Sequence, residues 1–272
     1  MTIKHRYYSF ALTKIKDSIV IVTGASTGIG YVICETLGRR GARLVLAARQ
    51  KEALDSAAAK LAAAGIDAVA CATDISSRDQ AKKLVQYAID RYGTVDILIN
   101  NAAIGLFQTI AESSHEEIAS VMSTNFFGSL NCIQECVPLM RKQKRGHIVN
   151  ISSIIGHHSV YHQGVYAASK AALDRISESL QAEEAAHNIK VTLVIPDRTS
   201  TSFIEHVVGP RNLAVLPGGN MRMLTPESVA AGVAAAIESD QLVHYSSIKG
   251  RMFAALSSTF PAVIRYVMRP HQ

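Results

Sequence analysis

The feature that most constrains the fold of this chain is a regular alternation of short apolar runs with longer helical patterns. The apolar runs lie at 18–23, 43–48, 68–73, 95–100, 147–152, 190–195 and 242–246, and the helical patterns lie at 29–40, 51–64, 78–92, 115–141, 165–186 and 226–239. Strands that are apolar throughout are typical of a parallel sheet covered by helices on both faces. The sequence therefore predicts an α/β fold with a doubly wound parallel sheet.

The alternation continues without a linker, repeat or low-complexity segment. The length of 272 residues fits one domain of this kind, and the hydrophobic share of 48% is that of a globular protein. We therefore predict a single Rossmann-like domain at 18–248. It is preceded by an N-terminal extension at 1–17 and followed by an amphipathic C-terminal tail at 249–272.

The charge pattern argues against several classes of partner. The net charge is +6, but lysines and arginines are interspersed with acidic residues, so we do not expect nucleic-acid binding. No apolar stretch is long enough to cross a membrane, and 1–17 does not resemble a secretory signal. Cytoplasmic localisation is therefore expected. The four cysteines form no CxxC pair, and we predict no metal site, so Cys132 and Cys136, one helical turn apart, are interpreted as ordinary helix residues.

A glycine-rich loop, TGASTGIG at 23–30, joins the first apolar run to the first helical pattern. Glycines allow a sharp turn and a close approach of the backbone to a ligand. The helix that follows offers unpaired N–H groups and the positive end of its dipole, which suit a phosphate. This context predicts a dinucleotide-binding loop, with these residues as cofactor ligands: Thr23, Gly24, Ser26, Thr27, Gly28, Ile29 and Gly30.

A second group of residues carries chemistry. Tyr166 and Lys170 are four apart on a predicted helix and share one face, and Ser153 follows the fifth apolar run. A tyrosine is a poor base at neutral pH, but a neighbouring ammonium group favours the phenolate, so we expect Lys170 to lower the pKa of Tyr166. Ser153 is then placed to hydrogen-bond the same substrate oxygen. The set predicts proton transfer by Tyr166.

The TGxxxGxG loop, the serine thirteen residues before YxxxK and the NNAA segment at 100–103 together resemble the short-chain dehydrogenase/reductase (SDR) family. The resemblance covers about 18–246. It implies an oxidoreductase that transfers a hydride between a nicotinamide cofactor and an alcohol or carbonyl compound. It also implies that Tyr166 is the acid/base, that Lys170 and Ser153 assist it, that Asn125 supports a proton relay, and that the protein is a homodimer or homotetramer.

The same resemblance assigns further residues to the cofactor: Asp74 to the adenine, Asn101 to support of the central sheet, and Thr201 to the carboxamide, with Ile75, Ala102 and Pro196 beside them. The chain departs from the family pattern at two positions, since Ala103 and Asp197 stand where glycine is usual. Asp197 puts the nicotinamide contacts in question.

The choice of cofactor depends on the end of the second apolar run. An NAD enzyme needs an acidic residue near Ala48 to bind the ribose 2′-hydroxyl. Arg49 follows Ala48 instead, and its guanidinium suits a 2′-phosphate. We therefore expect NADP(H), with NAD(H) second. The structural alternative for Arg49 is a solvated surface charge.

The substrate side is less specific. We expect a lid at about 202–224, whose apolar residues indicate either a lipid-like, steroid-like or aromatic substrate or ordinary packing of the lid. Ile155, Tyr161 and Phe203 are the candidate substrate contacts, together with Ser153. Arg198 is either a surface charge or a substrate contact.

Two questions stay open from the sequence. The amphipathic tail suits packing on the domain, an oligomer interface or contact with a membrane surface. The fold also suits a cofactor-binding sensor without turnover, or an epimerase or dehydratase that uses the cofactor transiently. The intact Ser–Tyr–Lys set favours an oxidoreductase acting on a small molecule.

Overall fold

The computed structural model describes residues 12–209 and 223–267. Its centre is a seven-stranded sheet in the order β3-β2-β1-β4-β6-β7-β9, in which every pair of neighbours is parallel. The strands are β1 Ile19–Thr23, β2 Arg43–Ala48, β3 Ala68–Ala72, β4 Ile97–Asn100, β6 Gly146–Ile151, β7 Ile189–Ile195 and β9 Val243–Tyr245. The predicted α/β fold with a doubly wound parallel sheet is confirmed.

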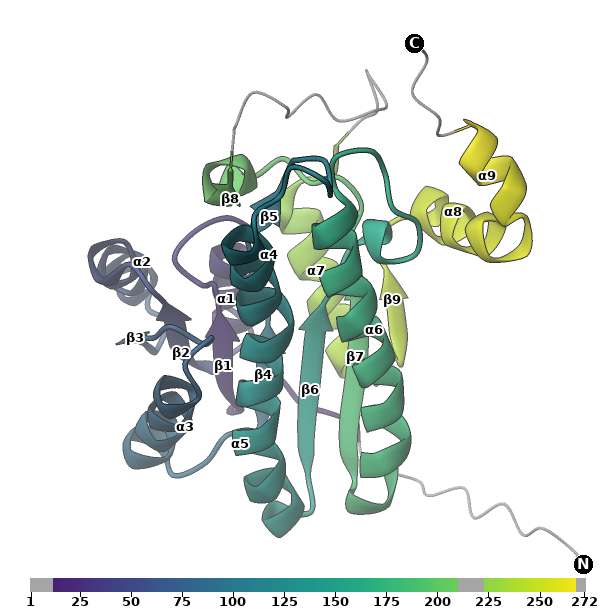
Figure 1. Cartoon of the computed structure of the whole chain (residues 1–272). Coiled ribbons are helices and arrows are strands. Elements are labelled where there is room, and N and C mark those ends of the chain that lie inside the picture. The colour runs from purple at the N-terminus through teal and green to yellow at the C-terminus, as the bar shows by residue number, and fades with distance from the viewer. Residues whose placement is uncertain (1–11, 210–222, 268–272) are drawn as a thin grey trace, which may run out of the picture.

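Helices cover both faces of the sheet (Figure 1). One face packs against α1 Gly28–Gly38, α2 Lys51–Ala63 and α7 Pro226–Glu238. The other packs against α3 Arg78–Tyr92, α5 Gly128–Gln143 and α6 Gly164–Glu184, with α4 His115–Met122 in line with α5. Because both faces are covered, strands such as β1 and β4 are buried at every residue, which explains their continuous apolar runs.

The order of the strands fixes where a ligand binds. The chain winds outward from β1 through β2 to β3 and then returns to β4 on the other side of β1. In open α/β sheets, ligands bind at the carboxyl ends of the strands beside such a reversal. The glycine loop follows β1 at this edge and Asn101 follows β4, so these two parts of the predicted cofactor site meet there.

The long helical pattern at 115–141 is one helical segment with an irregular middle. The α4 helix passes into a π-helical turn at Ser123–Phe127, and α5 continues through Pro138 to Gln143. The departure from α-helical geometry therefore lies at the turn that contains Asn125 and not at Pro138. Such π turns are frequent at functional sites.

Two strands were not predicted. β5 Gly105–Leu106 and β8 Val207–Val208 pair in parallel and form a small second sheet. Each has only two residues, which is too short to produce a periodic pattern in the sequence. This pair joins the loop after β4 to the first part of the predicted lid.

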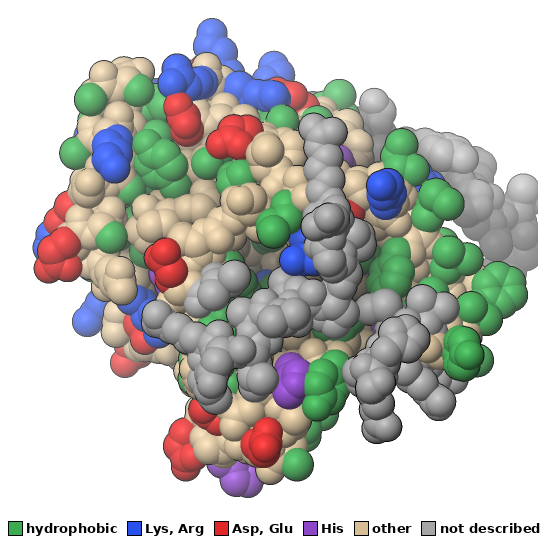
Figure 2. Space-filling model, turned by 90° about the horizontal axis from the view of Figure 1, so that it is seen from above, with side chains coloured by type: hydrophobic (Ala, Val, Ile, Leu, Met, Phe, Trp, Pro, Cys, Tyr) green, Lys and Arg blue, Asp and Glu red, His purple; other side chains and the backbone are tan. Residues whose placement is uncertain are grey.

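The tail begins with two helices, α8 Ile248–Thr259 and α9 Pro261–Val267, separated at Phe260 just before the proline. Their apolar side chains are largely solvent-exposed, Ile248 at 80% and Tyr266 at 75%. Figure 2 shows hydrophobic side chains gathered on the side of the molecule where these helices lie. In the part of the chain that the structure describes, no helix is long and apolar enough to span a bilayer.

Parts of the predicted division lie outside the described residues. These parts are 1–11 of the N-terminal extension, 210–222 of the lid and 268–272 of the tail. The boundaries of the extension, the lid and the tail stay predictions.

Candidate active site

A cavity of about 720 Å³ opens at the carboxyl edge of the sheet. It brings together residues that are far apart in the sequence, from the glycine loop to the segment after β7. The predicted site residues that line it are Gly24, Ser26, Thr27, Gly28, Ile29, Gly30, Arg49, Asp74, Ile75, Asn101, Ala102, Ser153, Ile155, Tyr166, Lys170, Pro196, Thr201 and Phe203. Three other predicted residues, Thr23, Asn125 and Tyr161, are not among the lining residues.

The glycine loop is packed too closely to tolerate side chains. Gly24 has a φ of +64°, and a Cβ there would lie 2.7 Å from the Cα of Ala102. A Cβ on Gly30 would lie 2.2 Å from the carbonyl oxygen of Gly24. Contacts this short force the backbone to move, so both positions require glycine.

Asn101 and Thr23 hold this loop from below. The Asn101 Nδ2 donates to the carbonyl oxygens of Thr23 and Gly24, at 2.9 and 3.1 Å. The Thr23 Oγ1 accepts hydrogen bonds from the backbone N–H groups of Asn101 and Ala102, at 3.0 and 3.1 Å. Thr23 is completely buried. It therefore supports the loop and does not face the cavity.

The start of α1 offers donors to an anion. Thr27 occupies the N-cap position of α1, but its side chain makes no capping hydrogen bond. The first N–H groups of a helix have no partner within the helix, so those at Gly28, Ile29 and Gly30 are open to a ligand. A glycine cradle with free donors fits the pyrophosphate of a dinucleotide. The residues present therefore fit a nicotinamide cofactor at this end of the cavity.

Two charged residues, Arg49 after β2 and Asp74 after β3, line the cofactor end of the cavity. Arg49 is exposed at the end of β2 and lines the cavity, and no acidic side chain of the described residues forms an ion pair with it. Asp74 accepts hydrogen bonds at Oδ1 from the backbone N–H and the hydroxyl of Ser76, at 3.0 and 2.7 Å. Ser77, and not Asp74, caps α3.

Tyr166 and Lys170 lie one turn apart on α6, where Lys170 is buried and Tyr166 is half-buried. The Lys170 Nζ donates to the carbonyl oxygen of Ile151 at 2.9 Å and lies 5.8 Å from the centre of the Tyr166 ring. Ser153 follows β6 directly, and a hydrogen bond joins its side chain to Tyr166. The three side chains predicted to act together are therefore brought to one place.

The electrostatics of this group differ from the prediction. Burial raises the pKa of Tyr166 to about 12, and the hydrogen bond with Ser153 opposes this only in part. We expected a lowered pKa for Tyr166, but the net shift in this structure is upward, because burial of the phenol dominates. Burial of Lys170 lowers its own pKa to about 8, while the nearby Asp174 carboxylate acts in the opposite direction. A sequence shows neighbours along a helix, but it does not show desolvation.

Asn125 is fully buried in the π turn, and its amide is satisfied on both sides. Oδ1 accepts from the backbone N–H of Ile104 at 2.8 Å, and Nδ2 donates to the carbonyl oxygen of Ile104 at 2.9 Å. Nδ2 also lies 3.0 Å from the Ser169 Oγ, on the helix that carries Tyr166. Asn125 thus ties the loop after β4 to α6.

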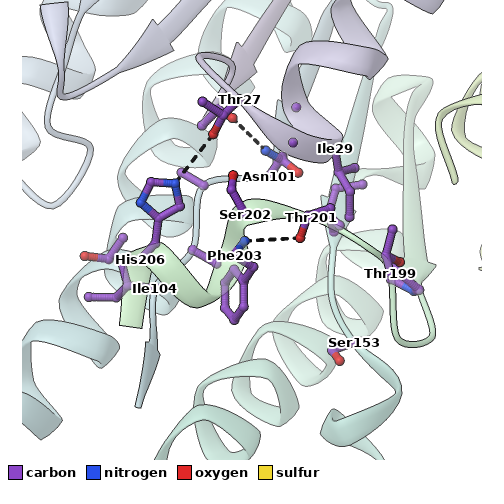
Figure 3. A pocket seen from close by; sticks show the side chains of 18 of the residues that line it. Thr27, Ile29, Asn101, Ile104, Ser153, Thr199, Thr201, Ser202, Phe203 and His206 are labelled. Carbon is purple, nitrogen blue, oxygen red and sulfur yellow. Dashed lines mark hydrogen bonds between the residues drawn. The ribbon is translucent and has the colours of Figure 1, made fainter. Parts of the chain in front are cut away.

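The substrate end of the cavity is formed by side chains from loops (Figure 3). The Phe203 ring lies 5.6 Å from the Tyr166 ring, measured between ring centres. Thr201 caps the short helix that carries Phe203 and lies against Gly28, so this segment connects both ends of the cavity. In Figure 3, Ser153 lies on the opposite side of this segment from Ile29. Tyr161 is 55% exposed and outside the cavity.

Sequence reasoning did not single out several lining residues: Ile104, Phe107, Thr124, Gln163 and His206. Phe107 and Ile104 flank the unpredicted strand β5, so no pattern pointed to them. The Nε2 of His206 lies 3.5 Å from the hydroxyl oxygen of Thr27, so this side chain contacts the glycine loop. Gln163, three residues before Tyr166, was the one with a usable signal, because it stands at the start of the same helix.

The cysteines and acidic residues provide no metal centre within 12–209 and 223–267, where no cluster of three or more suitable ligands is found. Cys132 and Cys136 are buried in α5. Burial raises the pKa of the Cys132 thiol to about 12 and that of Cys136 well above its usual value. These thiols therefore stay protonated and pack as apolar side chains.

The chain resembles known proteins over most of its length. The family model for short chain dehydrogenases matches residues 18–210. Over 240 residues, the chain is 31% identical to an uncharacterized oxidoreductase of Staphylococcus aureus strain MW2, covering 88% of this chain and 99% of that protein. It is also 34% identical over 236 residues to the glycine betaine reductase of Emericella nidulans, covering 86% of this chain but only 18% of that much longer enzyme.

Solved structures have the same fold. A short chain dehydrogenase/reductase from Burkholderia phymatum, in complex with NAD, superimposes with a TM-score of 0.83 and 25% identity, covering 95% of this chain and 98% of that one. A metagenomic short-chain oxidoreductase in complex with NADP superimposes with a TM-score of 0.71 and 31% identity, covering 84% and 94%. The two relatives differ in cofactor.

Proposed function

The chain belongs to the short chain dehydrogenase family of oxidoreductases, and we propose that it transfers a hydride between NADP(H) and a carbonyl or alcohol substrate. The observation that carries the proposal is the convergence of Ser153, Tyr166 and Lys170 in the cavity that the glycine loop also lines. A glycine loop alone supports binding, and a Tyr–Lys pair alone supports little. Together in one cavity they support catalysis.

When bound, a nicotinamide would supply or accept the hydride, while the protein orients the substrate and transfers the proton. With a pKa of about 12, the Tyr166 phenol is protonated at neutral pH and can donate its proton to a carbonyl oxygen during reduction. Ser153 donates a hydrogen bond to the same oxygen and fixes its position. The Lys170 ammonium stabilises the phenolate that remains after the proton has left.

Asn125 supports this chemistry from behind. Its amide joins Ile104, which lines the cavity, to Ser169 on α6, and the Ser169 hydroxyl donates to the Tyr166 carbonyl oxygen at 2.7 Å. We assign Asn125 to the proton relay that the family resemblance implies, as a residue that positions α6 and the loop after β4. Ile155 and Phe203 are the proposed apolar contacts of the substrate.

The proton-transfer role is tested with Tyr166→Phe. We expect NADPH to bind within about twofold of its original affinity, while carbonyl reduction falls at least about 100-fold, as for other general acids. Binding is followed by the fluorescence of NADPH and turnover by its oxidation, with a panel of apolar ketones and aldehydes. A variant that keeps its activity would remove Tyr166 from the mechanism, and a protein that binds neither NADPH nor NADH would favour the non-catalytic alternative.

Cofactor preference is a separate proposal that depends on Arg49. Its exposed guanidinium beside Ala48 forms no ion pair within 12–209 and 223–267, and it suits the 2′-phosphate of NADP(H). We expect Arg49→Ala to weaken NADPH binding about tenfold or more and to leave NADH binding within threefold. Arg43→Ala is the matched control, because Arg43 is exposed at the other end of the same strand and does not line the cavity. Tighter binding of NADH by the unaltered protein contradicts the assignment.

A further inference from the structure

Arg198 is the most unusual polar residue of the cavity. It lines the cavity, yet its Nε and Nη1 atoms are shielded from solvent and have no hydrogen-bond partner among the described residues. An arginine side chain is charged at every accessible pH, and shielding its N–H groups from water without a hydrogen-bond partner is unfavourable. Unpaired polar atoms of this kind call for a partner outside the protein, and their place in the cavity favours a ligand.

The backbone places Arg198 at the substrate end. The N–H of Ile154 donates to the carbonyl oxygen of Pro196 at 3.1 Å, which ties the segment after β7 to the loop that carries Ser153. The backbone N–H of Leu224 donates a hydrogen bond to the carbonyl oxygen of Arg198 at 2.8 Å. Contact with the glycine loop is made three residues later, at Thr201. The backbone of Arg198 therefore lies nearer to the Ser153 loop than to the pyrophosphate-binding loop, and its side chain lines the cavity from there.

The acidic residues of the cavity do not neutralise Arg198. Only Asp74 and Asp197 line the described part of the cavity. Asp74 is engaged by Ser76 at the opposite end, and Asp197 accepts a hydrogen bond from the Ser247 hydroxyl. The positive charge of Arg198 is thus left for a ligand.

A second side chain of the same end also has an unused donor. Gln163 is 2% exposed and lines the cavity, and its Nε2 has no hydrogen-bond partner in the part of the chain that the structure describes. It stands three residues before Tyr166, at the start of α6. The substrate end thus holds unused donors on two different elements, which favours a ligand rich in acceptor atoms.

We propose that the substrate carries a carboxylate, which binds the guanidinium of Arg198, while its carbonyl or hydroxyl group faces Ser153 and Tyr166. This inference rests on the proposed function and names the class of its substrate as an oxo acid or hydroxy acid. The remainder of the substrate is apolar and lies against Phe107, Ile155 and Phe203. Charge-assisted, bidentate pairing with a carboxylate is the interaction that a guanidinium makes best.

The test compares each of a series of oxo-carboxylic acids with its own methyl ester, using NADPH at pH 7. The spacing between ketone and carboxylate is varied from one to eight carbons. We expect at least one acid to have a kcat/KM tenfold or more above that of its ester. Arg198→Met, which keeps the length of the side chain, should abolish this preference, and Arg198→Lys should keep part of it. Arg251→Met is the control, because Arg251 is exposed and lies outside the cavity.

Three results would overturn the inference. The first would be that the acids and esters are reduced equally well, or that the esters are preferred throughout. The second would be that the preference for the acid survives in Arg198→Met. The third would be a tenfold loss of NADPH binding in Arg198→Met, which would assign the guanidinium to the cofactor.

Failure of the proposed function is recognised separately, by a lack of NADPH binding and oxidation. In that case, calorimetric titration with hexanoate, benzoate and their methyl esters still tests whether Arg198 binds a carboxylate. Binding of a carboxylate that is tighter than that of its ester and lost in Arg198→Met supports the inference, and its absence overturns it. Thermal unfolding of each variant shows whether the fold is intact.

Discussion

The two ends of the cavity are built by different means. At the cofactor end, backbone atoms and small residues form the surface, and a Cβ added at Gly24 or Gly30 meets backbone atoms at less than 3 Å. At the substrate end, long side chains such as Arg198, Gln163 and Phe203 project from a loop, the start of α6 and a short helix. One end recognises a shape and charge common to dinucleotides, whereas the other is defined by side chains that can change without moving the backbone.

The difference explains why the two ends carry different amounts of information in a sequence. A backbone cradle requires glycines at fixed spacing, so it leaves a motif. A pocket of side chains leaves no fixed spacing, because the loops that carry it come from separate elements. The open donors follow the same division, since those at the cofactor end are backbone N–H groups at the start of α1, whereas those at the substrate end belong to the side chains of Arg198 and Gln163.

The largest expected effect is that of adding a Cβ at Gly24, where a steric clash adds to the strain of a positive φ; Gly65 has the strain without the clash. Gly24 and Gly65 both have positive φ, at +64° and +78°, but no atom lies within 4 Å of a Cβ added at Gly65. Gly65→Ala should therefore lower the free energy of unfolding by only about 1–2 kcal/mol, the cost of the left-handed conformation. Gly24→Ala adds a clash with Ala102, so we expect a larger loss and NADPH binding weakened at least about 100-fold.

Chemical denaturation and NADPH titration of both variants measure these effects. If Gly24→Ala binds NADPH as well as Gly65→Ala does, then the tight cradle is not what the cofactor requires. The contrast between the two ends would then be lost.

The next effect concerns the proton-transfer group between the two ends. With a pKa of about 8, Lys170 loses its proton as the pH rises through 8, whereas Tyr166, at about 12, keeps its own. We expect kcat for carbonyl reduction to fall about tenfold between pH 8 and pH 9.5. The Asp174 carboxylate raises the pKa of Lys170, so Asp174→Asn should move this fall to lower pH.

A pH profile of kcat for the unaltered protein and for Asp174→Asn makes the measurement, with Asp90→Asn, an exposed substitution on α3, as the control. A fall that begins only above pH 10, or one that does not move in Asp174→Asn, would show that Lys170 does not set the profile. The position of the fall is the readout, because a merely structural effect of Asp174 would lower kcat without shifting it.

Much of the fold was predictable because buried parallel strands leave apolar runs. β2 was predicted at its observed bounds, and β1 and β3 within one residue. The glycine loop, Asn101 and the Ser–Tyr–Lys group were predictable as residues, since each occupies a fixed place relative to a strand end. Their assignment to cofactor and catalysis remains a proposal.

The rest depended on properties that one chain does not display. Burial decides the pKa values of Tyr166 and Lys170, and burial results from packing between distant segments. The buried polar pairs show the same limit, because Asn100 donates to Asn150, fifty residues away, at 2.9 Å. The strands β5 and β8 hold two residues each, so their pairing depends on the surrounding loops.

The smallest effect tests the position where this chain departs from its family. Asp197 stands where glycine is usual, and its carboxylate accepts a hydrogen bond from Ser247, the residue that caps α8 through the N–H of Gly250 at 2.9 Å. Asp197 thereby ties the substrate end of the cavity to the C-terminal helices. Because the hydrogen bond is charge-assisted but joins only partly buried groups, we expect Asp197→Gly to lower the free energy of unfolding by about 1 kcal/mol. NADPH binding should change less than twofold.

Ser247→Ala removes the same bond from the other side and also the cap of α8, so its effect on unfolding should be equal or slightly larger. The double variant should cost no more than Ser247→Ala alone, since both changes remove one interaction. Additive effects would mean that Asp197 acts elsewhere, and a tenfold loss of NADPH affinity in Asp197→Gly would place it at the cofactor end. In either case the boundary between the two ends would have to be redrawn through the segment after β7.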